Sequence, residues 1–357
     1  MAAKTKEKQY LHIYQSIRRD IESGLYPTGS KLPSKRTVAR DFGVSVITAE
    51  HALQLLEDEG YVTARERSGC FVTYDEASTF AVESIENMTR SYWPEVDSDE
   101  TGFPFGVYAK TARRVLSNYG EAVLQRCPNF GTDILRSALS LYLARARHIE
   151  AEPSQIIIGS GAEYLYGLIL QVLGRSRIYG IEDPSYEKIS QVYKANDITT
   201  QSLPLGPDGI VSPALWESDA QVLHITPYRS YPSGVTATNA KKREYMRWRA
   251  QRNAYIIEDD FESEITPASK PEETLFSMDD SGRVLYVNTF TNTVSTAVRT
   301  AYLVVPKTLQ KEFEDRIGFY TCTVPTFDQY ILAELILNGD FERHINKVRR
   351  QKRKSSE

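Results

Sequence analysis

The sequence predicts an α/β protein with two unlike domains, a small helical one at the N-terminus and a larger one built on a mostly parallel sheet. Residues 33–72 contain two short amphipathic helical patterns separated by a glycine turn and followed by two extended runs. From Gly102 onward, short apolar runs alternate with helical stretches, the pattern of repeated strand and crossover-helix units. We therefore expect domains at residues 1–74 and 101–357. Residues 75–100, rich in Glu, Asp and Ser, are predicted to be a linker.

The small domain is predicted to contain three helices. The first spans about residues 8–23, where apolar residues recur on one stripe before Gly24. Ser34 is expected to cap a second helix over residues 35–42. Ser45 is expected to cap a third helix, which ends at Gly60. The buried stripe of this third helix consists of Ala49, Ala52, Leu53 and Leu56.

Two extended runs, residues 61–65 and 70–73, surround a turn over residues 66–69 and complete a helix, turn, helix and wing arrangement. The start of the third helix carries small or polar groups, as recognition helices do where they meet base edges. The alternative is that the helices and hairpin form a plain small core. The polar side chains on the open faces argue for a nucleic-acid surface instead. The residues predicted to bind DNA are Ser34, Lys35, Arg36, Ser45, Val46, Ile47, Thr48, His51, Arg65, Arg67, Ser68 and Gly69.

Several of these motifs resemble those of a known protein family. The strings Leu32-Pro33-Ser34-Lys35-Arg36, Gly43-Val44-Ser45, Glu59-Gly60-Tyr61 and Ser68-Gly69 resemble the winged-helix domain of GntR-family bacterial transcription regulators. The resemblance covers about residues 8–74 and implies double-stranded operator DNA as a partner. The family often has an arginine where this chain has Val46. A valine can contact a thymine methyl group but cannot hydrogen-bond to guanine.

Composition and charge agree with a globular DNA-binding protein. The 357 residues are 41% hydrophobic and 25% charged, and no window approaches the roughly 18 apolar residues that a membrane span needs. We therefore predict a cytoplasmic protein with no membrane partner. The net charge is −4, yet residues 1–74 carry 11 Lys and Arg against 9 Asp and Glu. The basic end of the chain is thus the predicted DNA-binding domain.

Cysteine and histidine usage predicts neither a disulfide framework nor a metal site. Cys70, Cys127 and Cys322 lie far apart in the sequence without CxxC spacing. The five histidines are scattered without carboxylate or cysteine partners at ligand spacing. We expect the cysteines to be plain thiols and no metal to be bound.

The larger domain is predicted to have a phosphate-sized turn at one strand end. The strand at residues 156–158 leads directly into Gly159-Ser160-Gly161-Ala162 and then an apolar helix to Leu173. Such a turn presents backbone N–H groups and a hydroxyl where a phosphate could sit. Other predicted strands lie at residues 177–181, 222–225, 254–257 and 284–288, with helices at 132–144, 239–252 and 341–350.

The strand ends of this domain resemble the large domain of fold-type I, pyridoxal-phosphate-dependent aminotransferases. Together with the winged helix, the whole chain resembles the MocR group of GntR-type regulators. The resemblance implies a phosphate site at Ser160, Gly161, Ala162 and Arg299, a stacking aromatic at Tyr186 and an acid for the pyridine nitrogen at Asp259. It rests on the strings Glu182-Asp183-Pro184-Ser185-Tyr186, Tyr231-Pro232-Ser233-Gly234, Ile256-Ile257-Glu258-Asp259-Asp260-Phe261 and Asn288-Thr289-Phe290-Thr291-Asn292.

The chain departs from that pattern at functional positions. Asn292 stands where the family has its Schiff-base lysine, and an amide nitrogen is no nucleophile. Phe261 and Arg229 replace a tyrosine and a histidine of the family. The family's smaller C-terminal domain is also expected to be lacking, since the sequence ends at Glu357. We therefore predict no catalytic residues and, at Asn292 and its neighbours, weak and non-covalent binding of pyridoxal phosphate.

Two classes of function follow, and a third is kept open. The first is a DNA-binding transcription regulator, acting as a homodimer, whose aminotransferase-like domain serves dimerisation and the sensing of a small-molecule effector. The second is a pyridoxal-phosphate-dependent aminotransferase with an accessory DNA-binding domain, against which Asn292 argues. The third is a decayed regulator that dimerises and binds DNA without sensing a ligand.

Overall fold

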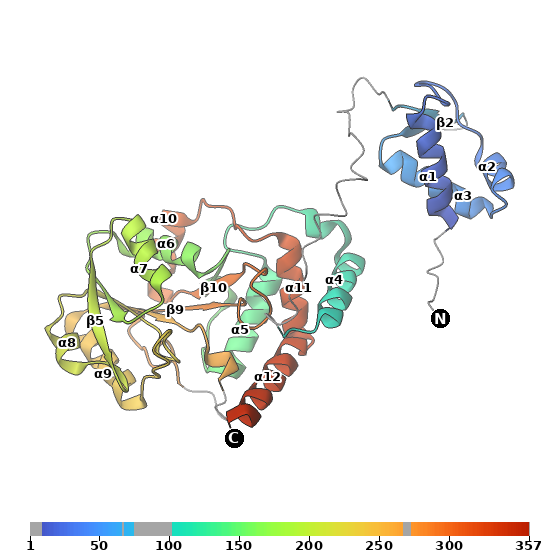
Figure 1. Ribbon diagram of the computed structural model, residues 1–357. Coiled ribbons are helices and arrows are strands. Elements are labelled where there is room, and N and C mark those ends of the chain that lie inside the picture. Colours follow the sequence, from blue (N-terminus) through green and yellow to red (C-terminus); the bar gives the residue numbers. More distant parts are fainter. Residues whose placement is uncertain (1–8, 66–67, 75–101, 267–272, 357) are drawn as a thin grey trace. The chain divides into compact units, whose positions relative to one another are not determined.

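The computed structural model describes residues 9–65, 68–74, 102–266 and 273–356, which fold into two separate compact units (Figure 1). The division falls between Glu95 and Val96. The linker predicted at residues 75–100 and the predicted DNA contact Arg67 lie outside the described residues.

The N-terminal unit has three helices and a two-stranded hairpin, as predicted. Its helices are α1 (Gln9–Glu22), α2 (Lys35–Asp41) and α3 (Val46–Asp58), and its strands are β1 (Val62–Arg65) and β2 (Gly69–Val72). The strands pair antiparallel, with Val62 opposite Val72. The predicted stripes of α1 and α3 meet in one core, which includes Ile13, Ile17, Ala49, Leu53 and Leu56.

The body is organised around one sheet. Its described residues form an eight-stranded sheet with the strand order β3-β10-β9-β8-β7-β4-β5-β6. The pairs β5–β4, β4–β7, β7–β8 and β8–β9 are parallel, whereas β10 runs antiparallel to both of its neighbours and β6 runs antiparallel to β5. The sheet is thus mostly parallel, as the sequence predicts. The strands are β3 (Ile156–Gly159), β4 (Tyr179–Asp183), β5 (Thr200–Gly206), β6 (Gly209–Ile210), β7 (Val222–Ile225), β8 (Tyr255–Asp259), β9 (Val284–Thr289) and β10 (Ala301–Val304).

Helices cover both faces of this sheet (Figure 1). One face packs on α6 (Ala162–Leu173), α7 (Glu187–Ala195) and α10 (Gln310–Ile317). The other face packs on α5 (Asp133–Arg147), α11 (Thr326–Leu337) and α9 (Asn239–Arg252). The remaining helices are α4 (Phe105–Tyr119), α8 (Ser212–Glu217) and α12 (Asp340–Ser356).

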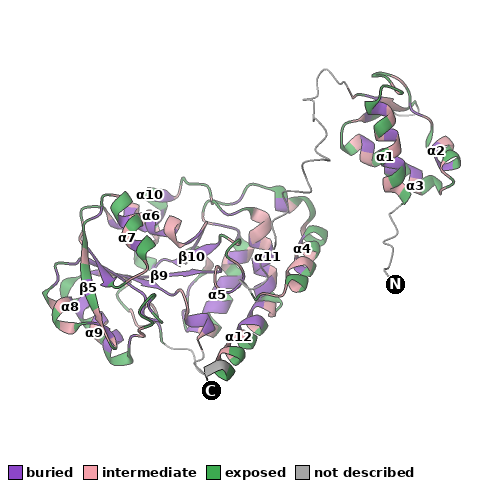
Figure 2. Ribbon diagram, in the orientation of Figure 1, coloured by how far each residue is buried: buried purple, intermediate pink, exposed green. Residues whose placement is uncertain are grey.

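Strand alternation explains how one sheet serves two cores. Ile157 faces the core that contains α6, whereas its neighbours Ile156 and Ile158 face the core that contains α5. Figure 2 shows central strands such as β9 and β10 as buried between these layers, whereas β5 has only one buried position. Within the described part of the chain, no helix is long and apolar enough to cross a membrane.

Candidate DNA-binding surface and candidate ligand pocket

The start of α3 is a capped helix end with apolar side chains pointing outward. The Ser45 hydroxyl accepts the backbone N–H of Thr48 at 3.1 Å, which satisfies one of the free amides of the first turn. Because this cap begins the helix at Val46, the side chains of Val46 and Ile47 lie on its outer face. They are 40% and 79% exposed. An exposed valine and isoleucine at a helix start suit contact with thymine methyl groups.

The other predicted DNA contacts lie mostly on the surface of this unit. Lys35 is exposed, but its Nζ pairs with Glu50 Oε1 at 2.6 Å, so its charge is partly compensated. The Arg65 guanidinium lies 4.6 Å from the centroid of the Phe71 ring, which holds it beside the hairpin. The His51 ring packs against Tyr10 with centroids 4.2 Å apart. Ser34, Arg36, Ser45, Ser68 and Gly69 are also exposed, and Thr48 is half-buried.

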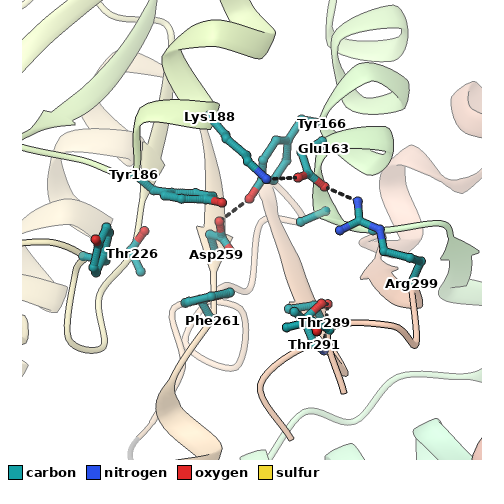
Figure 3. A pocket seen from close by; sticks show the side chains of 14 residues that line it. Glu163, Tyr166, Tyr186, Lys188, Thr226, Asp259, Phe261, Thr289, Thr291 and Arg299 are labelled. Atoms are coloured by element: carbon teal, nitrogen blue, oxygen red, sulfur yellow. Dashed lines mark hydrogen bonds and ion pairs between the residues drawn. The ribbon is translucent and has the colours of Figure 1, made fainter. Parts of the chain in front are cut away.

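The body contains a pocket at the carboxyl ends of its parallel strands (Figure 3). Its volume is about 280 Å³. Ligand sites of open α/β sheets lie at this edge, just beyond the strand ends. The lining comes from the start of α6, the start of α7, the ends of β8 and β9 and the segment before β10. The lining residues are Gly161, Ala162, Glu163, Tyr166, Tyr186, Lys188, Thr226, Tyr231, Asp259, Phe261, Thr289, Thr291, Thr296 and Arg299.

The turn before α6 needs glycine at residue 161. Gly161 has φ of +102°, and a Cβ added there would lie 2.8 Å from a guanidinium nitrogen of Arg299. No side chain caps α6 at this end. The start of a helix with a nearby arginine is a site suited to an anion.

The anion at this site is supplied by the protein itself. The carboxylate of Glu163 contacts Lys188 Nζ at 3.3 Å through one oxygen and an Arg299 nitrogen at 3.1 Å through the other (Figure 3). Burial alone raises the pKa of Glu163, but its own backbone N–H, Arg299 and Lys188 outweigh burial and hold the pKa below its usual value. Glu163 is therefore an ionised group placed between the two cations of the pocket.

Asp259 lies at the floor of the pocket and is positioned by buried neighbours. Its carboxylate accepts a hydrogen bond from the Tyr166 hydroxyl, and His224 Nε2 lies 3.5 Å from the same oxygen. Tyr193 hydrogen-bonds to the other ring nitrogen of His224. Asp259 is thus a fixed carboxylate facing the pocket, suited to pair with a protonated ring nitrogen.

The aromatic walls of the pocket are Tyr186 and Phe261. Their rings are nearly parallel, with an interplanar angle of 18° and centroids 6.2 Å apart. Both side chains are half-buried, so a planar ligand can reach them. The pocket therefore combines flat apolar walls, an acid at its floor and cations at one side.

The structure brings together five of the seven residues that the sequence assigns to a cofactor. Gly161, Ala162, Tyr186, Asp259 and Arg299 line the pocket; Ser160 and Asn292 do not. The Ser160 N–H donates to Thr323 Oγ1 at 3.1 Å, and the Asn292 amide donates to the Phe261 carbonyl at 3.3 Å. Glu163, Tyr166 and Lys188 are lining residues that the sequence analysis did not single out.

A buried carboxyl beside the pocket has a strongly shifted pKa. Glu182, near the end of β4, accepts hydrogen bonds from Ser230 Oγ at 2.6 Å and from the Thr226 N–H at 3.2 Å. Burial raises the pKa of Glu182 to about 8, and these hydrogen bonds offset only part of that effect. In the folded protein Glu182 is therefore largely protonated near neutral pH.

Replacing Glu182 by Gln is expected to remove part of the pH dependence of stability. Between the ordinary glutamate pKa and about 8, the folded state binds more protons than the unfolded state. The stabilisation that protonated Glu182 contributes is therefore fully present at acid pH. It is lost as the pH rises from the ordinary glutamate pKa to about 8. Relative to the unaltered protein, Glu182→Gln should gain stability steadily between pH 5 and pH 8, by on the order of a few kcal/mol. Denaturant titrations at both pH values measure this, with exposed Glu217→Gln as the control; parallel curves for all three proteins would contradict it.

Comparison with known proteins gives results for each unit. Residues 9–72 match the family described as bacterial regulatory proteins, gntR family. The chain is 29% identical to the HTH-type transcriptional regulator YdeL of Bacillus subtilis, covering 97% of this chain and 77% of that protein. It is 27% identical to the pyridoxine biosynthesis transcriptional regulator PdxR of Corynebacterium glutamicum, covering 94% and 74%. The probable rhizopine catabolism regulatory protein MocR of Rhizobium meliloti is 26% identical, covering 95% and 73%.

Solved structures similar to the body are aminotransferases. The kynurenine aminotransferase of Pyrococcus horikoshii superposes with a TM-score of 0.64 at 23% identity, over 70% of this chain and 64% of that one. The multiple substrate aminotransferase of Thermococcus profundus gives a TM-score of 0.64 at 23% identity, over 77% and 73%. This likeness shows that the body has the aminotransferase fold. Among the described residues, no group of His, Cys, Asp and Glu side chains could hold a metal ion.

Proposed function

We propose that the chain is a transcription regulator of the MocR group of the GntR family, in which the N-terminal unit and the body have separate roles. The N-terminal unit binds double-stranded DNA through α2, α3 and the β1–β2 hairpin. The body binds a small-molecule effector in its pocket without a covalent bond. The observation that carries the proposal is the family match over residues 9–72, together with the capped and outward-facing start of α3.

The DNA contacts divide into two kinds by their chemistry. Arg36 and Arg65 are exposed cations suited to phosphates, which position the domain and supply salt-dependent affinity. Val46, Ile47 and Thr48 lie at the start of α3, where side chains reach base edges. We propose that the protein acts as a homodimer, because a pair of such domains reads two half-sites and gains affinity that one weakly basic domain lacks.

The pocket residues fit pyridoxal phosphate in part. Asp259 can pair with the protonated ring nitrogen, Tyr186 can lie against the ring and the turn at Gly161 leaves room beside Arg299. When bound, this cofactor supplies an aldehyde that reacts with amines. Residue 292 offers no amine, and the carboxylate of Glu163 already pairs with Arg299 and Lys188 and so competes with a phosphate for them. Weak and non-covalent binding follows from these two features.

The second candidate is a working aminotransferase, and the presence of Lys188 in the pocket is the observation that favours it. Lys188 Nζ, however, lies beside Glu163, and its chain position at the start of α7 differs from that of residue 292, which follows β9. The relatives PdxR and MocR are named as regulators. We therefore favour regulation over catalysis.

Borohydride reduction is expected to leave the protein unlabelled at residue 292. The amide of Asn292 cannot capture an aldehyde, so the peptide containing it should keep its mass after incubation with pyridoxal phosphate and borohydride. The variant Asn292→Lys, treated in the same way, should gain a stable adduct and serves as the positive control. A stoichiometric adduct on Lys188 of the unaltered protein would favour the enzyme instead.

Replacing Glu163 by Gln is expected to tighten binding of pyridoxal phosphate by about tenfold, because the phosphate no longer competes with a carboxylate for Arg299 and Lys188. Fluorescence titration measures the affinity. Glu187→Gln is the matched control, since it removes an equal charge at the start of α7 from a residue that does not line the pocket. Equal affinities for the two variants would show that Glu163 does not block the anion site.

A further inference from the structure

Two cysteines that are far apart in the sequence meet in the body. The side-chain amide nitrogen of Gln329 lies 3.0 Å from Cys127 Sγ and 3.4 Å from Cys322 Sγ. Because both sulfurs contact the same amide nitrogen, the two thiols lie next to each other. Both are free in the structure, Cys127 buried and Cys322 half-buried.

Hydrogen bonds between the two surrounding segments hold the thiols close together. Asn129 Nδ2 donates to the Gly318 carbonyl at 2.6 Å, and Arg126 donates to Thr321 Oγ1 at 3.1 Å. The Thr326 hydroxyl donates to the Gln125 carbonyl at 3.0 Å. These bonds join the segment before α5 to the segment between α10 and α11. Neither cysteine lies in a helix or strand, so the backbone can adjust to an S–S bond of about 2.05 Å.

The two thiols differ in chemical character. The hydrogen bond from the Cys322 thiol, joined by those from Gln329 and Thr326, lowers the pKa of Cys127 despite its burial. The same contact, with burial, raises the pKa of Cys322. A thiolate attacks oxidants, whereas a thiol does not, so Cys127 is the nucleophile and Cys322 the resolving partner. Burial raises the pKa of Cys70, the third cysteine, which lies in the other unit.

We propose that Cys127 and Cys322 form a redox-responsive dithiol that hydrogen peroxide converts into an intramolecular disulfide. The Cys127 thiolate attacks one peroxide oxygen, the O–O bond breaks and hydroxide leaves, giving a sulfenic acid. The Cys322 sulfur then attacks the Cys127 sulfur, the S–S bond forms, the S–O bond breaks and water leaves with the Cys322 proton. Overall, two thiols lose two electrons and two protons, and one peroxide becomes two waters.

The dithiol lies against the turn that forms the anion side of the pocket. Cys322 Sγ lies 3.5 Å from the Ile158 carbonyl oxygen, and Thr323 Oγ1 accepts a hydrogen bond from the Ser160 N–H at 3.1 Å. A bond between the sulfurs removes the S–H donor and pulls the adjoining Thr323 toward Cys127. We therefore expect oxidation to loosen the turn at residues 159–161, whether or not the pocket binds pyridoxal phosphate.

The test uses the full chain carrying Cys70→Ser, so that only the two body cysteines remain. After treatment with a slight excess of hydrogen peroxide, both thiols should disappear together. Peptide mass analysis should show Cys127 linked to Cys322 within one chain, with full reversal by dithiothreitol. Oxidation of one cysteine to a sulfinic acid while the other stays free, or links only between chains, would overturn the proposal.

Two further measurements separate the chemistry from general oxidation. Adding Cys322→Ser to the same background should prevent the disulfide and leave a Cys127 sulfenic acid that dimedone traps. If dimedone traps nothing at Cys127, then Cys127 is not the nucleophile. Amide hydrogen exchange reads the turn directly, and the Ser160 amide should exchange several-fold faster in the disulfide form. Equal exchange in the reduced and oxidised proteins would overturn the link to the pocket.

Discussion

Replacing Arg147 by Met is expected to lower the free energy of unfolding of the body by about 3–5 kcal/mol. Arg147 pairs with Asp260 at 2.7 Å, and the two side chains are only 3% and 0% exposed. Removing the cation leaves a buried carboxylate without its charge partner. The guanidinium also lies 4.7 Å from the centroid of the Tyr228 ring, a contact that Met retains only in part.

The same change should also affect the pocket, because Asp260 directly follows Asp259, the last residue of β8. Asp259 contacts Tyr166, whereas Asp260 contacts Arg147. Loss of the Arg147 pair releases the strand end that presents Asp259. Denaturant unfolding measures the effect, with Lys307→Met as the matched control. Lys307 pairs with Glu152 at 2.6 Å, but both side chains are more than half exposed, so its loss should lower stability far less than the loss of Arg147. Equal losses for the two variants would contradict the importance of the buried pair.

Replacing Ile47 by Asp is expected to weaken binding to a specific DNA duplex by at least about a hundredfold. The change removes an apolar contact surface at the start of α3 and places a negative charge where phosphates and base edges approach. The fold should survive, because Ile47 is 79% exposed. Fluorescence anisotropy with a labelled duplex measures the affinity.

The matched control for that variant is Leu25→Asp. Leu25 is 67% exposed in the same unit and lies after α1 rather than on α3, so the substitution changes the net charge equally. It should alter affinity only a few-fold. If both variants lose affinity to the same degree, general charge rather than α3 governs binding; if neither does, the recognition surface is wrongly assigned.

Local sequence signals predicted much of the fold. Ser34 and Ser45 cap α2 and α3 as expected, and the helix predicted over residues 239–252 has those bounds in the structure, behind the cap Thr238. The strands β5, β6 and β10 were missed, and β6 has only two residues. Strand β5 has only one buried position and contains Pro204, so it lacks a clear alternation of buried and exposed residues. Strand β10 has only four residues, all buried, and four apolar residues do not distinguish strand from helix.

The candidate pocket was predictable only where a residue belongs to a short motif. Gly161 and Asp259 each lie in a recognisable string at a strand end. The role of Glu163 depends on Lys188 and Arg299, which come from other elements. No local sequence pattern predicts these two ion pairs. The contact between the cysteines of the body could not be predicted for the same reason, because it depends on two distant segments that meet at Gln329.

The assignment as a DNA-binding regulator is tested most directly by selecting duplexes from a random pool with the full chain. Specific binding by a pair of winged helices should enrich sequences that contain two copies of one half-site, spaced by about one helical turn or a multiple of it. Enrichment should persist at physiological salt, where non-specific phosphate contacts weaken. A retained pool as random as the input, under conditions where the protein still binds DNA, would contradict the assignment.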